Sequence, residues 1–237
     1  MAARSSIEWT HASWNPLTGC TKISPGCDHC YAERMAVRLH GIGVAKYANG
    51  FKLTLHEDLL ELPLTWKRPR AIFVNSMGDL FHRDVPAEFI RRVFDVMRQA
   101  RRHRFQILTK RSDRLLELSS SLPFDPHVSV GVTVENQKYK FRIDHLRQTA
   151  AATKFVSMEP LLGPVRDLDL TGIDWVYPGG ESGPDARPMD PAWVEEIREQ
   201  CERQGVSFHL KQWGGKSRNE TEDEPARGLT LFPELEG

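Results

Sequence analysis

Short apolar runs alternate with amphipathic stretches through the middle of the chain. The apolar runs predict strands over 71–75, 104–110, 127–134, 153–160, 173–182 and 206–215. The stretches between them have the apolar spacing of helices over 86–102, 112–118, 135–148 and 190–205. We interpret the strands as continuous apolar runs, which is typical of a parallel sheet that is buried on both faces.

A further strand is expected just before residue 19, which makes roughly seven βα-type units. This pattern predicts an α/β fold, a partial or distorted (β/α) barrel of the TIM type, with a doubly wound open sheet as the second choice. We expect a single domain over residues 1–215. Residues 216–237 are polar with a run of charges, and they predict an irregular extension.

The composition is that of an ordinary globular chain, with 40% apolar and 27% charged residues. Basic and acidic residues number 32 each, so the net charge is zero and a dedicated nucleic-acid coat protein is disfavoured. No run approaches the roughly 18 apolar residues of a membrane span, and the first residues lack the apolar stretch of a signal peptide. We therefore expect a cytoplasmic protein that does not contact membranes.

Three of the four cysteines lie close together in the stretch "GCTKISPGCDHCYAER". Cys20, Cys27 and Cys30 have the spacing C-x6-C-x2-C, whereas Cys201 lies in a predicted helix and is expected to be a small core residue. A reducing cytosol disfavours structural disulfides, so a tight group of thiols there indicates metal binding or redox work.

Three readings of this loop, residues 19–31, remain open. Zinc would need a fourth ligand, which His29 or His11 could supply. The loop could also hold three reduced thiols without a metal. A [4Fe–4S] cluster fits best, because thiolates suit iron–sulfur ligation and three cysteines leave one iron open to a substrate or cofactor.

Polar residues follow each apolar run, where the carboxyl ends of parallel strands would converge on one rim. Active sites of (β/α) barrels are built at this rim. The residues in question are Ser76, Gly78, Asp79, Thr109, Lys110, Arg111, Thr133, Glu135, Asn136, Glu159, Gly179, Gly180, Glu181, Ser182, Lys211, Gln212 and Trp213.

Several motifs resemble the phage-associated three-cysteine-motif family of radical-SAM-like proteins. They are "WNPLTGCTKISPGCDHCYAER", "IFVNSMGDLFH", "FQILTKR", "VGVTVEN", "VSMEPLLGP", "WVYPGGESGPDARPM" and "KQWGG", and they extend from residue 7 to about 215. The resemblance implies a [4Fe–4S] cluster on Cys20, Cys27 and Cys30 that cleaves S-adenosylmethionine (SAM). The resulting 5′-deoxyadenosyl radical would abstract hydrogen from a substrate. The usual radical SAM spacing is C-x3-C-x2-C with an aromatic residue before the third cysteine, where this chain has His29.

The resemblance also implies roles for the rim residues by their strand positions. The amino end of SAM would lie against Ser76, Gly78 and Asp79. Its carboxylate would pair with Lys110 or Arg111, and its ribose would face Thr133 and Glu135. Substrate binding and proton transfer would then fall to Glu159, Glu181 and Lys211, with the indole of Trp213 either stacking on a planar substrate or capping the core.

The implied partners are an external electron donor and a dedicated partner protein encoded nearby. The class of the substrate is open, and nucleic acid is one candidate. Two other functions compete with this one. Glu159 and Glu181 on a barrel rim resemble the carboxylate pair of a glycosidase, which stands about 5 Å apart in retaining enzymes. The basic runs over 65–71 and 98–105 would suit a zinc- or cluster-containing nucleic-acid-binding protein, although cations also end helices favourably.

Overall fold

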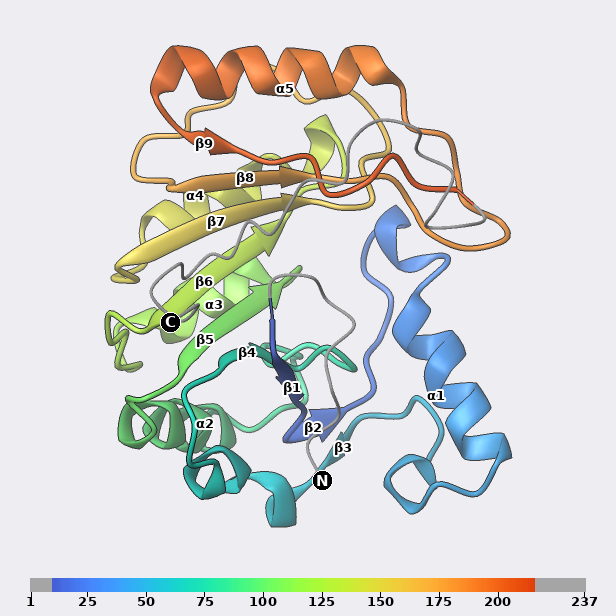
Figure 1. Ribbon diagram of the computed structural model, residues 1–237, viewed down its shortest axis with the longest axis vertical. Coiled ribbons are helices and arrows are strands. Elements are labelled where there is room, and N and C mark those ends of the chain that lie inside the picture. Colours follow the sequence, from blue (N-terminus) through green and yellow to red (C-terminus); the bar gives the residue numbers. More distant parts are fainter. Residues whose placement is uncertain (1–9, 216–237) are drawn as a thin grey trace.

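The computed structural model describes residues 10–215 (Figure 1). The predicted extension over 216–237 therefore lies outside the described residues. Within the described part, no helix is both long and apolar enough to cross a membrane.

A seven-stranded, fully parallel sheet forms the centre of the fold, in the linear order β1-β4-β5-β6-β7-β8-β9. The strands are β1 (Ala12–Trp14), β4 (Ala71–Val74), β5 (Arg104–Thr109), β6 (Val128–Thr133), β7 (Thr153–Met158), β8 (Trp175–Pro178) and β9 (Ser207–Phe208). Two short strands, β2 (Leu17–Thr18) and β3 (Thr54–Leu55), pair antiparallel outside this sheet. Among the described residues no pairing joins β1 to β9, so the sheet is an open (β/α) barrel. This confirms the predicted class.

Among the described residues, four of the five α-helices overlap stretches that the sequence predicts as helical, and the first does not. They are α1 (Tyr31–Gly41), α2 (Ala87–Gln99), α3 (Ser112–Ser119), α4 (Phe141–Arg147) and α5 (Pro191–Gln204). The ends of α5 have clear sequence signals, since the Asp190 side chain accepts from Ala192 N and Gly205 ends the helix in the left-handed region at φ 65°.

Most of the predicted elements are shorter in the structure, and for two of them the contacts show how. The helix expected over 135–148 is split, because the Asn136 side chain accepts from Lys138 N and starts a separate 3₁₀ turn, Gln137–Tyr139, ahead of α4. The strand expected over 206–215 pairs as a strand only at Ser207–Phe208. Beyond it the chain keeps single backbone bonds to β8, from His209 N to Val176 O and from Lys211 N to Pro178 O.

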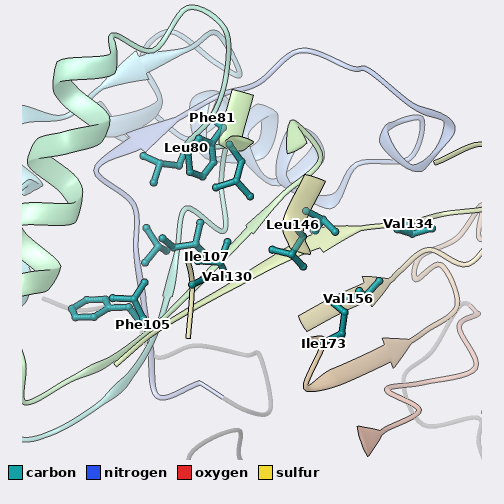
Figure 2. Packing of buried hydrophobic residues seen from close by; sticks show 14 of the residues in the cluster. Leu80, Phe81, Phe105, Ile107, Val130, Val134, Leu146, Val156 and Ile173 are labelled. Carbon is teal, nitrogen blue, oxygen red and sulfur yellow. The ribbon is translucent and has the colours of Figure 1, made fainter. Parts of the chain in front are cut away.

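The β6 strand is buried on both faces, but only one face is apolar, which corrects the interpretation of the strands as continuous apolar runs. In β6, Val128, Val130 and Val132 belong to the main apolar core, whereas Ser129, Gly131 and Thr133 alternate with them on the other face. Figure 2 shows this core, with Ile107 of β5, Val130 of β6 and Val156 of β7 among the packed side chains.

The opposite face opens toward a cavity. Apart from Leu108, the residues in register on that face are polar, small or aromatic: Phe73, Gln106, Ser129, Gly131, Thr133, Phe155, Ser157, Trp175 and Tyr177. Several of them line the cavity, and the arrows in Figure 1 show that the carboxyl ends of β5 to β9 point toward the side on which α1 lies. The α1 helix packs in a small apolar cluster of its own with Tyr47 and Met77, and so it stands apart from the main core.

Candidate functional site

A cavity of about 580 Å³ lies at the carboxyl ends of the strands. Most of the residues predicted for the site line it: Cys20, Cys27, Cys30, Ser76, Gly78, Asp79, Lys110, Thr133, Glu159, Glu181 and Lys211. Two predicted residues, Arg111 and Glu135, are not among the lining residues. A volume of this size is in the range of sites for small molecules and cofactors.

The cysteine loop, residues 19–31, connects β2 to α1 along one edge of the cavity. It begins at Gly19, whose φ of 87° and close approach to the Lys52 carbonyl leave no room for a side chain, since a Cβ would stand 2.3 Å from that oxygen. A bridge from Gly19 to Gly78 attaches this start to the loop after β4. All three thiols of the loop are free and partly exposed, so they are available to one ligand in the cavity.

Arg111, at the end of β5, holds the first part of the loop. Its Nη2 donates to the carbonyl (3.0 Å) and hydroxyl (2.9 Å) oxygens of Thr21 and lies 3.8 Å from Cys20 Sγ. Burial, followed by the charge of Asp79, raises the pKa of the Cys20 thiol to about 11, although Arg111 acts in the opposite direction. The structure thus places the Arg111 guanidinium against the cysteine loop. The resemblance had implied a different role, in which Lys110 or Arg111 pairs with the SAM carboxylate.

Glu135, just after β6, holds the middle of the loop. It is fully buried; Ser24 donates its hydroxyl to Oε1, and Arg142 donates to Oε2 at 2.8 Å. A Cβ on Gly26 would lie 2.7 Å from the Glu135 side chain, so the loop passes over this carboxylate. Both oxygens are engaged, and this geometry does not match the predicted contact of Glu135 with a ribose.

Glu181, after β8, holds the last part of the loop through Arg187. The Arg187 guanidinium donates to both Glu181 oxygens, at 2.9 and 2.6 Å, and to the Pro25 carbonyl at 2.9 Å. His29 Nδ1 lies 3.0 Å from Glu181 Oε2. Burial by itself would raise the pKa of Glu181, but hydrogen bonds from the Arg187 side chain and backbone and from His29 outweigh it and lower the pKa to about 2. Glu181 is therefore a buried carboxylate committed to the loop.

The residues after β4 and β5 form the wall nearest the loop. Asp79 Oδ1 accepts from Thr109 Oγ1 (2.7 Å) and Phe81 N (3.0 Å), and Oδ2 accepts from Lys110 N at 3.1 Å. Because Asp79 is fixed on three sides and lines the cavity, it presents an oriented negative charge to a cationic group there. The Lys110 ammonium lies 4.0 Å from Glu135 Oε1, and Ser76 Oγ bonds with the Asn15 side chain.

The late strands contribute a second polar group on the other side of the cavity. The Lys211 ammonium donates to Glu159 Oε2, while Gln212 Nε2 donates to Glu159 Oε1 (3.0 Å) and lies 2.6 Å from Ser182 Oγ. Trp213 lines the rim and is 37% exposed, so it does not cap the core. The early and late strands thus offer separate polar groups to the same cavity.

The two histidines considered as a fourth zinc ligand have other neighbours in the structure. Among residues 10–215, no group of three or more His, Cys, Asp or Glu side chains is close enough to hold one metal ion. His11 precedes β1, at the amino ends of the strands, and its Nδ1 accepts from Ala71 N, while His29 Nδ1 faces Glu181. One donor lies near a sulfur, with Arg111 Nη2 3.8 Å from Cys20 Sγ, and the Ser24 hydroxyl, which donates to Glu135, stands 3.7 Å from Cys27 Sγ.

Sequence reasoning missed Arg142 and Arg187, the two arginines that complete the loop contacts. Arg187 stands in the quoted motif "GGESGPDARPM", six residues after Glu181, and a buried carboxylate beside a glycine-rich loop calls for a cationic partner. Arg142 was hidden in a predicted helix, although a buried arginine on an apolar face is a signal of a buried carboxylate nearby.

The predicted basic run over 98–105 lies away from the cavity. It joins α2 to β5 and so stands at the amino ends of the strands. Arg98 and Arg101 pair with Asp125 there, at 3.5 and 3.9 Å. This run does not form a track of positive charge toward the site.

Comparison with known proteins agrees with this picture. A family model described as "Protein of unknown function (DUF5131)" matches residues 4–231. The chain belongs to this family. The search of curated proteins found no match.

Solved structures of spore photoproduct lyase share the fold. A complex of that enzyme with dinucleoside spore photoproduct matches with a TM-score of 0.54 and 10% identity, covering 89% of this chain and 79% of the other. A cysteine-to-serine mutant matches with a TM-score of 0.55 and 11% identity over the same shares. A double mutant with bound AdoMet and dinucleoside spore photoproduct has a TM-score of 0.50 and 10% identity, covering 86% of this chain and 64% of the other. At such low identity the likeness shows the fold alone, an open (β/α) barrel.

Proposed function

We propose that the protein is a radical SAM-type enzyme that acts on a substrate containing a nucleoside. The observation that carries this proposal is the meeting of three free thiols, Cys20, Cys27 and Cys30, at the edge of one cavity at the carboxyl ends of an open barrel. The fold shared with spore photoproduct lyase supports it, and so do the AdoMet and dinucleoside ligands named for that enzyme. Association with phages, a dedicated partner protein and an external electron donor remain predictions.

The three thiolates would hold a [4Fe–4S] cluster, with Arg111 donating to the sulfur of Cys20. When bound, such a cluster supplies one electron to SAM, which breaks its C–S bond and releases a 5′-deoxyadenosyl radical. Hydrogen bonds to the sulfurs stabilise the charged thiolate form and tune the reduction potential.

The chain's own groups then divide between cofactor and substrate. Asp79 presents an oriented carboxylate, suited to the ammonium of SAM, and Lys110 offers its ammonium to the SAM carboxylate from the same wall. Thr133 lines the cavity between the two walls, where a ribose would lie. On the late strands Lys211 Nζ donates to Glu159 and lines the cavity, so it is placed to donate to a substrate as well.

The glycosidase reading fits the geometry less well. A general acid needs a raised pKa, whereas the pKa of Glu181 is lowered to about 2 and both its oxygens are bound by Arg187. Glu159 is occupied by Lys211 and Gln212. Glu181 therefore does not resemble the protonated partner of such a pair, and both oxygens of Glu159 are already engaged.

Anaerobic reconstitution with iron and sulfide tests the proposal. We expect about four irons per chain and a broad absorbance band near ~400 nm, as thiolate-ligated clusters show. Reduction in the presence of SAM should then yield 5′-deoxyadenosine and methionine. Uptake of one zinc without iron, or a loaded cluster that leaves SAM intact, would refute the proposed function.

A further inference from the structure

The floor of the cavity contains polar side chains that the chain itself does not satisfy. Asn75, at the end of β4, and Ser157, in β7, are each only 3% exposed and line the cavity. Both polar atoms of the Asn75 amide and the Ser157 hydroxyl lack a hydrogen-bond partner among the described residues. Buried polar groups in native proteins are nearly always bonded, and each unpaired one destabilises the fold. These groups therefore mark a place where a ligand or ordered water completes the structure.

The backbone at Asn75 favours an amide in this position. Its φ of 60° lies in the left-handed region, where asparagine and glycine are the residues most readily accepted. Glycine would satisfy the backbone equally well but would leave no donor and acceptor in the cavity. The retained amide carries a C=O and an NH₂ group side by side, which is the pattern that pairs with the edge of a heterocycle.

Aromatic rings surround the second group. On the same face as Ser157, Phe155 precedes it by two residues, and Tyr177 stands opposite it in register on β8. The Phe155 and Tyr177 rings meet edge to face with centroids 6.0 Å apart, and both line the cavity. Gly131 makes this possible, since a Cβ there would lie 2.4 Å from the Phe155 ring. A flat, apolar wall beside an unpaired hydroxyl suits a planar ring with polar edges.

We propose that Asn75 and Ser157 bind a nucleobase of the substrate, with Phe155 and Tyr177 as its apolar wall. In the sheet β4 and β7 are separated by β5 and β6, so the two groups enter the cavity from different sides. A ligand that satisfies both carries hydrogen-bonding atoms on two edges of a planar ring, which is a property of nucleobases. Enzymes that act on a base commonly take it into such a pocket, where polar groups contact its edges and aromatic groups its faces.

This site rests on the proposed function for its substrate class, but its test needs neither cluster nor catalysis. Binding of the individual ribo- and deoxyribonucleosides and of SAM to the cluster-free protein is measured by calorimetry for the wild type and three variants. Ser157→Ala removes the unpaired hydroxyl, Asn75→Gly removes the amide and keeps the left-handed backbone, and Ser129→Ala is the matched control. Ser129 is also buried, unpartnered and on the same face of the sheet, yet it does not line the cavity.

We expect Ser157→Ala and Asn75→Gly each to weaken binding of the preferred nucleoside about tenfold, the equivalent of one lost hydrogen bond. Ser129→Ala should leave it within twofold, and all three should leave SAM binding within twofold. Since the Ser157 hydroxyl has no partner, its removal should not lower Tm, so a loss of binding cannot be assigned to unfolding.

Three results would overturn the inference: no nucleoside binding to the wild type, an equal loss in Ser129→Ala, or a loss of SAM binding in place of nucleoside binding. The last would assign Asn75 and Ser157 to the cofactor. Nucleoside binding with the expected pattern in a protein that takes up no iron would keep this site and refute the proposed radical chemistry. Conversely, SAM cleavage without nucleoside binding would refute this site alone.

Discussion

Removing the Arg187 guanidinium should loosen the last part of the cysteine loop while the rest of the fold stays intact. In Arg187→Gln the loop loses the hydrogen bond from the guanidinium to the Pro25 carbonyl. Buried Glu181 loses its bidentate ion pair with the same guanidinium. Hydrogen bonds to charged groups contribute about 1.5–3 kcal/mol each, and the side chain is 30% exposed, so we expect a net loss of about 2 kcal/mol in the local free energy of opening. That loss corresponds to an approximately 30-fold larger population of the open loop.

Amide hydrogen exchange of the cluster-free protein measures this opening directly. Inside the loop the amides of Cys27 and Asp28 are bonded to the Ser24 and Pro25 carbonyls at 2.9 and 3.2 Å, so their exchange reports on loop opening. In Arg187→Gln the peptide over 24–30 should exchange about 30-fold faster, with little change in the peptides of β5 and β6. Arg187→Lys should recover only part of the protection, because lysine keeps the charge but not the planar fork.

A matched control is available in Arg166, which pairs with Glu196 at 2.8 Å on the surface. Arg166→Gln removes an arginine–carboxylate pair of the same kind far from the loop in sequence, and it should leave exchange over 24–30 unchanged. Unaltered exchange over 24–30 in Arg187→Gln would refute the role assigned to this arginine. Equal acceleration throughout the chain would show that Arg187 stabilises the whole fold and has no particular effect on the loop.

Three further predictions address the other parts of the site. Alanine at Cys20, Cys27 or Cys30 should reduce iron uptake to less than half and abolish the visible absorbance band. Cys201→Ala should retain both the iron and the band, because Cys201 is buried in the apolar core. Equal iron uptake in all four variants would contradict this ligand set. Glu135→Gln leaves the buried charge of Arg142 unpaired, so Tm should fall by roughly 10 °C. The surface change Glu196→Gln should shift Tm by only about 1 °C. Similar shifts of Tm in the two variants would show that the buried pair contributes little to stability. The folded-state pKa of Glu181, about 2, lies below its ordinary value of 4.5. The contribution of Glu181 to stability is therefore complete above about pH 4.5 and is lost as the pH falls toward 2. The Tm difference between the wild type and Glu181→Gln should shrink over that interval, and a difference independent of pH would refute the assignment.

The sequence by itself determined the class of fold and the place of the site. Alternating apolar runs and amphipathic stretches specify parallel strands joined by helices, and the polar residues after successive strands must then meet at one edge, because all parallel strands end there. For this reason Ser76, Asp79, Lys110, Glu159 and Lys211 line one cavity, as predicted. The grouping of three cysteines within eleven positions, from Cys20 to Cys30, is local and needed no structure to be recognised.

Only the tertiary structure decided which rim charges face a ligand and which face the protein. Arg111, Glu135 and Glu181 contact the cysteine loop across 91, 111 and 152 residues of sequence, respectively. No local sequence pattern predicts such contacts. A charged residue at a strand end gives the same local pattern whether its side chain contacts a ligand or a distant loop. The sequence could not predict the unpaired amide of Asn75 either. Whether a buried polar group has a hydrogen-bond partner depends on every element that packs around it.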